Sequence, residues 1–368
     1  FLGLAGGAWW IAQRGWAPVA LGAGGVLPAL ALTVAFPEGG TFPFAASSFW
    51  PSLAVLAAAV LALPREERLL RAGGALYACA MVASFALQTP MGGNVVRLGA
   101  LVAGPLVACA LWGRRPALLA ALAVPLLWWQ WGAAADDWYR AERDPSVQQS
   151  YYAPLLRELQ RRGAGTALAR VEIPFTDNHW ESRWVAPHVP LARGWERQLD
   201  VRRNAIFYDG RTLTPAAYRR WLDANAVRWV ALSDAPLDYS AAAEAALVRR
   251  GLPYLREVWR DRHWRLFAVR DPAPLATGPA VVTRAGPQAV ELDARAAGTV
   301  RLSIFFTPYW RLAKGDGCVE RTADGRVRLR LRRPGQVRLD IAFDPTRMGA
   351  RSPRCTPLGG AGAASRTR

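Results

Sequence analysis

The sequence predicts an α-helical transmembrane bundle of five or six spans, followed by an extracytoplasmic α/β domain and a small antiparallel β-sandwich. Three observations support this fold class. Residues 1–135 form a succession of apolar runs, residues 136–271 alternate helical and strand patterns, and residues 272–347 contain only short alternating runs. The tail, 348–368, is rich in Gly, Ala, Ser, Pro and Arg, and is expected to be disordered.

The apolar runs approach the length of a membrane span, which is roughly 20 residues. The candidate spans are 1–12 (the end of a truncated helix), 16–36, 48–63, 69–88, 95–112 and 116–131. Such runs leave no polar face, so helices buried in a large soluble protein are the weaker interpretation. The chain starts inside an apolar run without a signal-peptide pattern, and we interpret it as the late part of a longer bundle.

The charge of the loops predicts the orientation of the spans. Bases occur only in alternate loops, at Arg14, Arg65, Arg68, Arg71, Arg114 and Arg115. Segments 37–47 and 89–94 carry no base. Because basic loops stay in the cytoplasm, the last span is expected to exit outward. The protein is therefore predicted in the cell membrane, with residues after 135 on the extracytoplasmic side.

The net charge of +18 says less about partners than its size suggests. Lys314 is the only lysine, and the excess of Arg, Ala, Gly, Pro and Trp is typical of a GC-rich bacterial genome. No basic-aromatic module of a nucleic-acid-binding type is present, so no nucleic-acid partner is predicted. The expected partner is the lipid bilayer, whose anionic headgroups attract basic surfaces.

Helix and strand patterns alternate in the α/β region. We expect helices at 151–162, 215–226 and 239–250, and strands at 169–174, 228–233, 255–260 and 264–269. Gly163 and Gly251 are suited to end the first and last helix, and Thr214 with Pro215 is suited to begin the middle one. Residues 261–262 are expected to form a hairpin turn.

In the sandwich region, strands are expected at 280–284, 289–293, 298–306, 310–313, 326–331 and 336–343. The segment 307–311 is interpreted as a hairpin with an aromatic anchor, and 315–317 as a turn. Cys318 and Cys355 lie in this extracytoplasmic part, where oxidation is allowed, and are a candidate disulfide. Cys79 and Cys109 lie within spans and are interpreted as packing residues.

The segment 176–198 has an unusual density of charged and aromatic side chains after a predicted strand, where α/β folds place ligand sites. The candidate ligand-binding residues are Asp177, His179, Trp180, Glu181, Arg183, Trp184, Trp195, Glu196 and Arg197. Tryptophan faces stack on sugar rings, and carboxylates and Arg bind hydroxyls. The alternative is a loop packed on the membrane surface, with its Trp and Arg at the interface.

Two more specific interpretations of this segment have less support from the sequence. A metal site would use His179, Glu181 and His188, but their spacing matches no standard zinc pattern, so no metal is predicted. Glu196 and Asp200 are four residues apart and could form an acid/base pair, but helical carboxylates are more often solvated or paired with Arg. The sequence has no P-loop, nucleophile elbow, dinucleotide fingerprint or Cys-x-x-Cys site, and no cofactor is predicted.

Arg97 stands at the outer end of a predicted span. A charge near the bilayer is costly unless it snorkels or pairs, so Arg97 is a candidate for contact with headgroups or a lipid phosphate. Simple snorkelling is the equally good alternative.

Several stretches together resemble a known group of proteins. They are GGNVVRLG at 92–99, PLARGWERQLDVRRNAIFY at 190–208, LTPAAYRRWLDANAVRWVAL at 213–232, FTPYWRL at 306–312 and GDGCV at 315–319. The chain resembles the C-terminal half of actinobacterial polytopic membrane proteins that carry the name 6-pyruvoyl-tetrahydropterin-synthase-related. It is also similar to GT-C-type glycosyltransferases and to the lipoteichoic-acid-glycosylating membrane protein family. The shared features are architectural and not catalytic.

The resemblance implies transfer of sugar from a polyprenyl-phosphate donor to a cell-envelope glycan on the outer face. In such enzymes the catalytic acid lies in the first outside loop, upstream of these residues, so the catalytic residues here are unknown. Within the resemblance, Arg97 is the candidate for the lipid phosphate. Two other functions stay open: a non-catalytic protein that binds or assembles envelope glycans, and a transporter. The absence of acids at mid-span disfavours a proton- or ion-coupled transporter.

Overall fold

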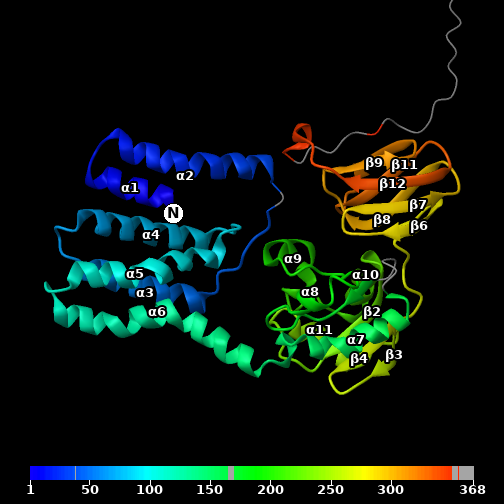
Figure 1. Cartoon of the computed structure of the whole chain (residues 1–368), viewed down its shortest axis with the longest axis horizontal. Helices are drawn as coiled ribbons and strands as arrows, with labels where there is room; N and C mark the ends of the chain where they lie inside the picture. The colour runs from blue at the N-terminus through cyan, green and yellow to red at the C-terminus, as the bar shows by residue number, and fades with distance from the viewer. Residues whose placement is uncertain (38, 165–169, 350–354, 356–368) are drawn as a thin grey trace, which may run out of the picture. The chain divides into compact units, whose positions relative to one another are not determined.

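The computed structural model describes residues 1–37, 39–164, 170–349 and 355, which divide into two compact units. The helical unit comprises Phe1–Asp144 and Glu196–Arg203, and the mixed unit comprises Pro145–Trp195 and Asn204–Arg368. Figure 1 shows helices in the first part of the chain and sheets in the second. The helices-then-sheets order agrees with the predicted fold class, and most of the predicted tail lies outside the described residues.

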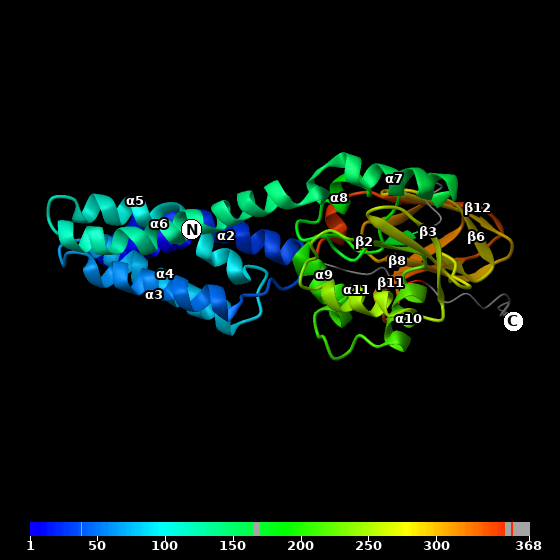
Figure 2. The ribbon, with the colours of Figure 1, turned by 90° about the horizontal axis from the view of Figure 1, so that it is seen from below.

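The helical unit consists of apolar helices that run side by side (Figures 1 and 2), a short 3-10 turn and a short charged helix. They are α1 (Leu2–Ala12), α2 (Trp16–Ala35), α3 (Ala46–Ala62), α4 (Arg68–Ala86), the 3-10 turn η1 (Gly92–Val95), α5 (Val96–Leu111), α6 (Pro116–Arg143) and the short α9 (Arg197–Arg203). Helix α1 packs on α2 and α4, α3 packs on α4, α5 and α6, and α5 packs on α6.

Among the described residues, four helical segments are long and apolar enough to cross a membrane: Trp16–Ala35, Arg68–Ala86, Gly92–Leu111 and Pro116–Arg143. Side chains such as Leu27, Val34 and Val124 are exposed on them. Contiguous apolar surface of this kind is unfavourable in water and favourable in a bilayer. The protein is therefore a multi-pass membrane protein.

Two predicted spans, 1–12 and 48–63, are present as helices but are too short to count among the candidate membrane spans. Helix α3 has 17 residues and α1 has 11, and both are shorter than the four candidate spans. At 1.5 Å per residue, α3 is about 25 Å long, somewhat less than a hydrocarbon core of about 30 Å. The end predicted for the last span, at residue 131, also lies inside α6. That helix continues to Arg143 because its polar end is itself helical, with Asp136 and Arg140 paired one turn apart at 2.6 Å.

Close packing in the helical unit depends on small residues. A Cβ on Gly6 would lie 2.6 Å from the carbonyl oxygen of Pro18, so only glycine allows α1 to approach α2 so closely. At the start of α5, the hydroxyl of Tyr77 donates to the Val95 carbonyl at 2.7 Å and accepts the Gly99 N–H at 3.0 Å. Tyr77 thereby satisfies backbone groups where η1 passes into α5.

The first part of the mixed unit is an α/β fold. Its helices are α7 (Gln149–Arg161), α8 (Glu181–Trp184), the 3-10 turn η4 (Ala205–Phe207), α10 (Pro215–Ala224) and α11 (Ala242–Arg249). Its strands are β1 (Arg170–Glu172), β2 (Val227–Ser233), β3 (Leu255–Arg260) and β4 (Trp264–Val269), in the order β1-β2-β4-β3. Strands β1 and β2 are parallel, and the other pairs are antiparallel.

Both faces of this sheet are covered. Helix α7 buries Tyr152, Leu155 and Leu159 in one core, while Tyr218 of α10 and Val248 of α11 belong to the other. Strand β2 is buried at six of its seven positions, as expected for a strand between two helical layers. The Thr214 side chain accepts the Ala217 N–H at 3.2 Å, and this confirms the predicted cap of α10.

The second part of the mixed unit is a sandwich of two four-stranded sheets. Their strand orders are β10-β11-β8-β5 and β6-β7-β12-β9. Its strands are β5 (Ala276–Thr277), β6 (Ala280–Ala285), β7 (Ala289–Ala294), β8 (Gly298–Phe305), β9 (Trp310–Lys314), β10 (Gly317–Arg321), β11 (Arg326–Leu331) and β12 (Gly335–Ile341), followed by the 3-10 turn η5 (Pro345–Arg347). Leu302, Leu329 and Leu339 are fully buried between the sheets.

The hairpin predicted at 307–311 is wrong. The segment joins β8 of one sheet to β9 of the other, so it crosses the sandwich instead of pairing its neighbours. Its aromatic anchor is present, because Trp310 is buried and its indole N–H donates to the Phe305 carbonyl at 3.2 Å. Strands β5 and β10 were not predicted, and the 315–317 turn passes directly into β10.

Candidate functional site

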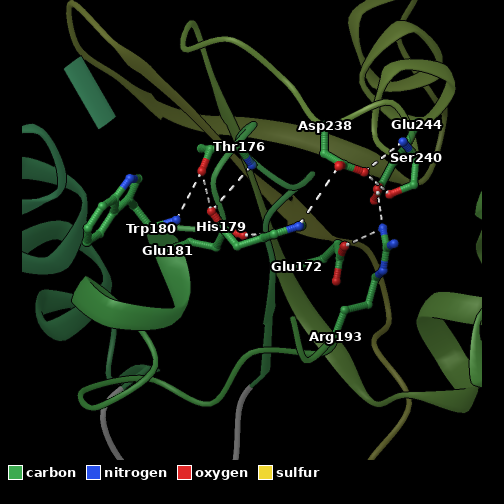
Figure 3. Close-up of polar contacts among 9 residues, drawn as sticks. All are labelled: Glu172, Thr176, His179, Trp180, Glu181, Arg193, Asp238, Ser240 and Glu244. Atoms are coloured by element: carbon green, nitrogen blue, oxygen red, sulfur yellow. Dashed lines mark hydrogen bonds and ion pairs between the residues drawn. The ribbon is translucent and has the colours of Figure 1, made fainter. Parts of the chain in front are cut away.

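The candidate site lies where β1 and β2 end. Because these strands are parallel, their carboxyl ends meet at one edge of the sheet, where α/β folds place ligands. The segments that follow the strands are held together by backbone hydrogen bonds. Asp238 N–H donates to the Phe175 carbonyl at 3.0 Å, and Asp177 N–H donates to the Pro236 carbonyl at 2.9 Å. Figure 3 shows the side chains that converge there.

Thr176 and Glu181 organise the first loop of the site. One carboxylate oxygen of Glu181 accepts the Thr176 hydroxyl at 2.6 Å and the Thr176 N–H at 3.3 Å. The Thr176 hydroxyl in turn accepts the Trp180 N–H at 3.3 Å. Both side chains are fully buried. This reciprocal arrangement resembles a capping box and fixes the entry into α8.

His179 lies between two carboxylates. Its Nδ1 is 3.4 Å from Glu181 Oε1 and its Nε2 is 3.9 Å from Asp238 Oδ2, with the ring edge-on to Phe175. Its backbone has φ of 56°, which is uncommon for a residue other than glycine and costs about 1 kcal/mol or more. Its side chain is 15% exposed, so the imidazole reaches solvent at one edge.

Arg193 forms the second part of the site. Its guanidinium lies 3.3 Å from Glu244 and 3.8 Å from Glu172, and all three side chains are buried. The rings of Phe175 and Phe207 are each 4.0 Å from the guanidinium carbon. Such cation–π contacts and ion pairs are what a buried arginine requires.

Two further contacts complete this buried cluster. The Tyr218 hydroxyl donates to Glu244 at 2.8 Å, and burial, with the charges of Glu244 and Glu172, raises the pKa of Tyr218 well above its ordinary value. Asp238 accepts the Ser240 hydroxyl at 2.6 Å and the Ser240 N–H at 2.9 Å, an Asx turn that leads into α11.

The tryptophans pack at the side of the cluster. The rings of Trp180 and Trp184 are stacked with centroids 6.4 Å apart, and the Trp184 indole N–H donates to the Val147 carbonyl at 3.2 Å. Arg183 is exposed, with its guanidinium carbon 5.1 Å from the Trp184 ring centre. The pair therefore braces α8 against the start of α7.

The structure brings together the part of the predicted ligand set between Asp177 and Trp184. Trp195 is 60% exposed and ends a stretch of the mixed unit, whereas Glu196 and Arg197 belong to the helical unit. Asp200 is buried and Glu196 is exposed, so the two carboxylates of the considered acid/base pair have different environments. No structural observation tests ligand binding by these residues, and that role stays a prediction.

Sequence reasoning missed Glu172, Arg193, Asp238 and Glu244, which complete the cluster. Their separation along the chain leaves no local signal, except for the Asp-x-Ser pattern that begins the Asx turn before α11. No family model, curated protein or solved structure matches this chain. The geometry of the site is therefore the guide to its chemistry.

That geometry limits what the cluster does. Glu172, Glu181 and Glu244 are fully buried, and they bind the Thr176, Arg193 and Tyr218 side chains of the same unit. Within the described residues, no group of three or more His, Cys, Asp or Glu is arranged to hold a metal ion. The cluster stabilises the loops at the end of the sheet and presents His179 and Arg183 at its edge.

The second candidate, Arg97, lies beside an apolar cavity in the helical unit. The cavity has a volume of about 490 Å³ and opens between α1, α3, α4 and α5. Its lining is almost wholly apolar and includes Leu98 and Gly99, the two residues directly after Arg97. Arg97 is exposed and forms no hydrogen bond or ion pair with any residue that the structure describes.

Cys318 and Cys355 are joined by a disulfide, with their Cα atoms 5.8 Å apart, which is an ordinary separation for such a bond. The bond ties the chain near its end to β10. Cys79 and Cys109 are unpaired and exposed on the membrane helices.

Proposed function

We propose that this protein handles a polyprenyl-phosphate-linked sugar at the outer face of the cell membrane, as a glycosyltransferase-like protein that transfers the sugar to a cell-envelope glycan. The observation that carries this proposal is the apolar cavity whose lining includes Leu98 and Gly99, next to the exposed Arg97. A lipid phosphate needs both features, a place for its hydrocarbon chain and a cation for its headgroup.

The cavity suits a hydrocarbon chain. Its volume of about 490 Å³ is within the range of ordinary ligand pockets, about 300–1,000 Å³. Its one hydroxyl, that of Tyr77, is already hydrogen-bonded to Val95 and Gly99. An apolar chain in the cavity would leave no polar group of Tyr77 unsatisfied.

Arg97 suits the phosphate. A guanidinium forms paired, charge-assisted hydrogen bonds with phosphate oxygens, and these strengthen where water is scarce. Arg97 lies in the first turn of α5, after the base-free segment 89–94. A charge at the outer end of a membrane span is stabilised when it pairs with a lipid headgroup.

Loop charge and the disulfide support the orientation that this function needs. The α1–α2, α3–α4 and α5–α6 loops carry arginines, as cytoplasmic loops do, whereas the intervening loops carry none. This arrangement supports an orientation in which Arg97 and the mixed unit lie outside. A Cys318–Cys355 disulfide is in keeping with an oxidising, extracytoplasmic environment.

A binding experiment tests the lipid half of the proposal. The full chain in phosphatidylcholine nanodiscs should bind a polyprenyl phosphate at least about tenfold more tightly than the polyprenyl alcohol of the same length. Arg97→Gln should remove that preference, and Ala103→Phe, which fills the cavity, should weaken binding of both lipids. Arg65→Gln is the matched control, because Arg65 is also exposed but lies in an arginine-rich loop. An Arg97→Gln protein that keeps the preference would contradict the proposal.

A non-catalytic role in binding or assembling envelope glycans is the second candidate. It is favoured by the burial of Glu172, Glu181 and Glu244, which leaves these carboxylates inaccessible as acid or base to a bound sugar. The two functions differ in turnover. Release of polyprenyl phosphate from a radiolabelled polyprenyl-phosphate sugar, in the presence of envelope glycan, supports the transferase. Glycan binding without release supports the second function.

A further inference from the structure

A hollow with both polar and apolar surface lies on the sandwich, in the sheet formed by β6, β7, β12 and β9. Its volume is about 570 Å³, and its wall includes Pro287, Gln288, Arg311, Arg338, Asp340 and Ile341. The β6–β7 turn supplies the first two of these residues, β9 supplies Arg311, and β12 supplies the rest. The backbone holds the turn in place, because the Ile341 N–H donates to the Gln288 carbonyl at 2.9 Å.

Arg338 is fixed within this hollow. Its Nε donates to Asp340 at 2.9 Å and its Nη1 donates to Glu291 at 3.0 Å. One guanidinium is thus held by carboxylates on β12 and on the neighbouring β7. These two bonds restrict the motion of the Arg338 side chain, and they use one carboxylate oxygen of Asp340.

Arg311 is the second arginine of the hollow, and its guanidinium is available to a ligand. It lies directly opposite Asp340 in the β9–β12 ladder, where side chains of neighbouring strands are close enough to pair. Asp340 turns to Arg338 instead, and Arg311 is exposed without a hydrogen bond or ion pair to any residue in the described ranges. With two arginines and one aspartate, the wall carries a net charge of +1.

The other wall residues suit a sugar. Gln288 is exposed and offers both a donor and an acceptor, and Asp340 retains a second oxygen for a hydroxyl. Pro287 is exposed and Ile341 is 39% exposed, so apolar surface lies beside these polar groups. Small-molecule sites combine apolar walls with a few placed polar groups in this way.

We propose that this hollow binds an acidic saccharide, with the sugar carboxylate on Arg311 and ring hydroxyls on Gln288 and Asp340. The inference goes beyond the proposed function, because it requires neither Arg97 nor the lipid cavity. It gives the sandwich a role of its own, that of holding a uronic-acid-bearing glycan.

The test uses the full chain in phosphatidylcholine nanodiscs, titrated calorimetrically with tri-galacturonate and with its methyl ester. The ester has the same hydroxyls without the charge, so it should bind at least about tenfold more weakly. Arg311→Gln should reduce tri-galacturonate affinity to about that of the ester, and Gln288→Ala should weaken both ligands. Arg284→Gln is the matched control, because Arg284 is exposed on β6 of the same sheet but does not line the hollow.

Equal affinity for the acid and its ester would overturn the inference, and this comparison needs no variant to fold. Unchanged binding by Arg311→Gln would also overturn it, as would the absence of tri-galacturonate binding. Polyprenyl-phosphate binding in the same nanodiscs is read separately. A failure of the lipid proposal therefore leaves the saccharide result intact, and the reverse also holds.

Discussion

Arg193 and Glu244 form an ion pair with an N–O distance of 3.3 Å, although both side chains are buried. Arg193 lies after the loop that follows β1, and Glu244 lies on α11, which follows β2. The ion pair therefore connects the two segments that come after the parallel strands. Desolvating two charges is costly, and such a pair is maintained only when other groups complete it. Here Phe175, Phe207 and Tyr218 do so.

Replacing Arg193 by Met should destabilise the mixed unit by about 3–5 kcal/mol, because Glu244 keeps its burial and loses its cation. Arg183→Met is the control, since Arg183 is exposed and its loss should cost less than about 0.5 kcal/mol. Thermal unfolding, followed by the near-UV signal of the tryptophans, measures both. Equal stability of the two variants would show that the pair contributes nothing.

The pairing of Glu257 with Arg260 and Arg265 should affect stability at acid pH. Hydrogen bonds from Arg260 and Arg265 lower the pKa of Glu257 from 4.5 to about 2. Because the folded pKa is depressed, this stabilisation is complete above about pH 4.5 and is lost as the pH falls to about 2. The side chain is partly exposed, so solvent screening limits the effect to about 1 kcal/mol.

Glu257→Gln tests this dependence. The variant should be less stable than the wild type at pH 6, and the difference should shrink as the pH falls toward 2. Denaturant titrations at several pH values give the two curves. A difference that stays constant over this range would assign the effect of the substitution to packing and not to charge.

The Cys318–Cys355 disulfide should stabilise the end of the sandwich. It closes a loop with a sequence separation of 37, for which chain entropy predicts about 2–4 kcal/mol. Cys318→Ser, or reduction of the wild type, should lower the unfolding midpoint of the mixed unit. The double replacement of Cys79 and Cys109 by Ala is the control and should leave that midpoint unchanged. If reduction does not shift the midpoint, the bond has no stabilising role.

The fold was most predictable from sequence where the signals are local. Thr214 and Pro215 begin α10, and Gly251 follows α11, because caps act through the adjacent backbone. Strand pairing across the sandwich is different. The segment 307–311 has the composition of a hairpin, yet β8 and β9 join different sheets, because the choice of partner depends on distant strands.

The candidate site follows the same division. The density of Trp, Asp and Glu after β1 marked the stretch from Asp177 to Trp184, and the structure places it at the carboxyl end of the sheet. Arg193 and Glu244 are separated by 51 residues and are joined only through the folded chain, so no spacing pattern predicts their contact. Hydropathy sets the end of the last span at residue 131 and leaves open whether the polar stretch from Asp136 is a linker or a helix leaving the membrane, and the structure shows that it is helical up to Arg143.

The orientation of the chain in the membrane underlies both the lipid and the saccharide proposals. Two cysteine variants report it directly, in a background with Cys79 and Cys109 replaced by Ala. Glu66→Cys lies in the arginine-rich α3–α4 loop, and Thr283→Cys lies on β6, and both positions are exposed. In intact cells, a membrane-impermeant maleimide should label Thr283→Cys at once and should label Glu66→Cys only after permeabilisation. Labelling of Glu66→Cys in intact cells, with Thr283→Cys protected, would reverse the orientation and contradict the proposed function.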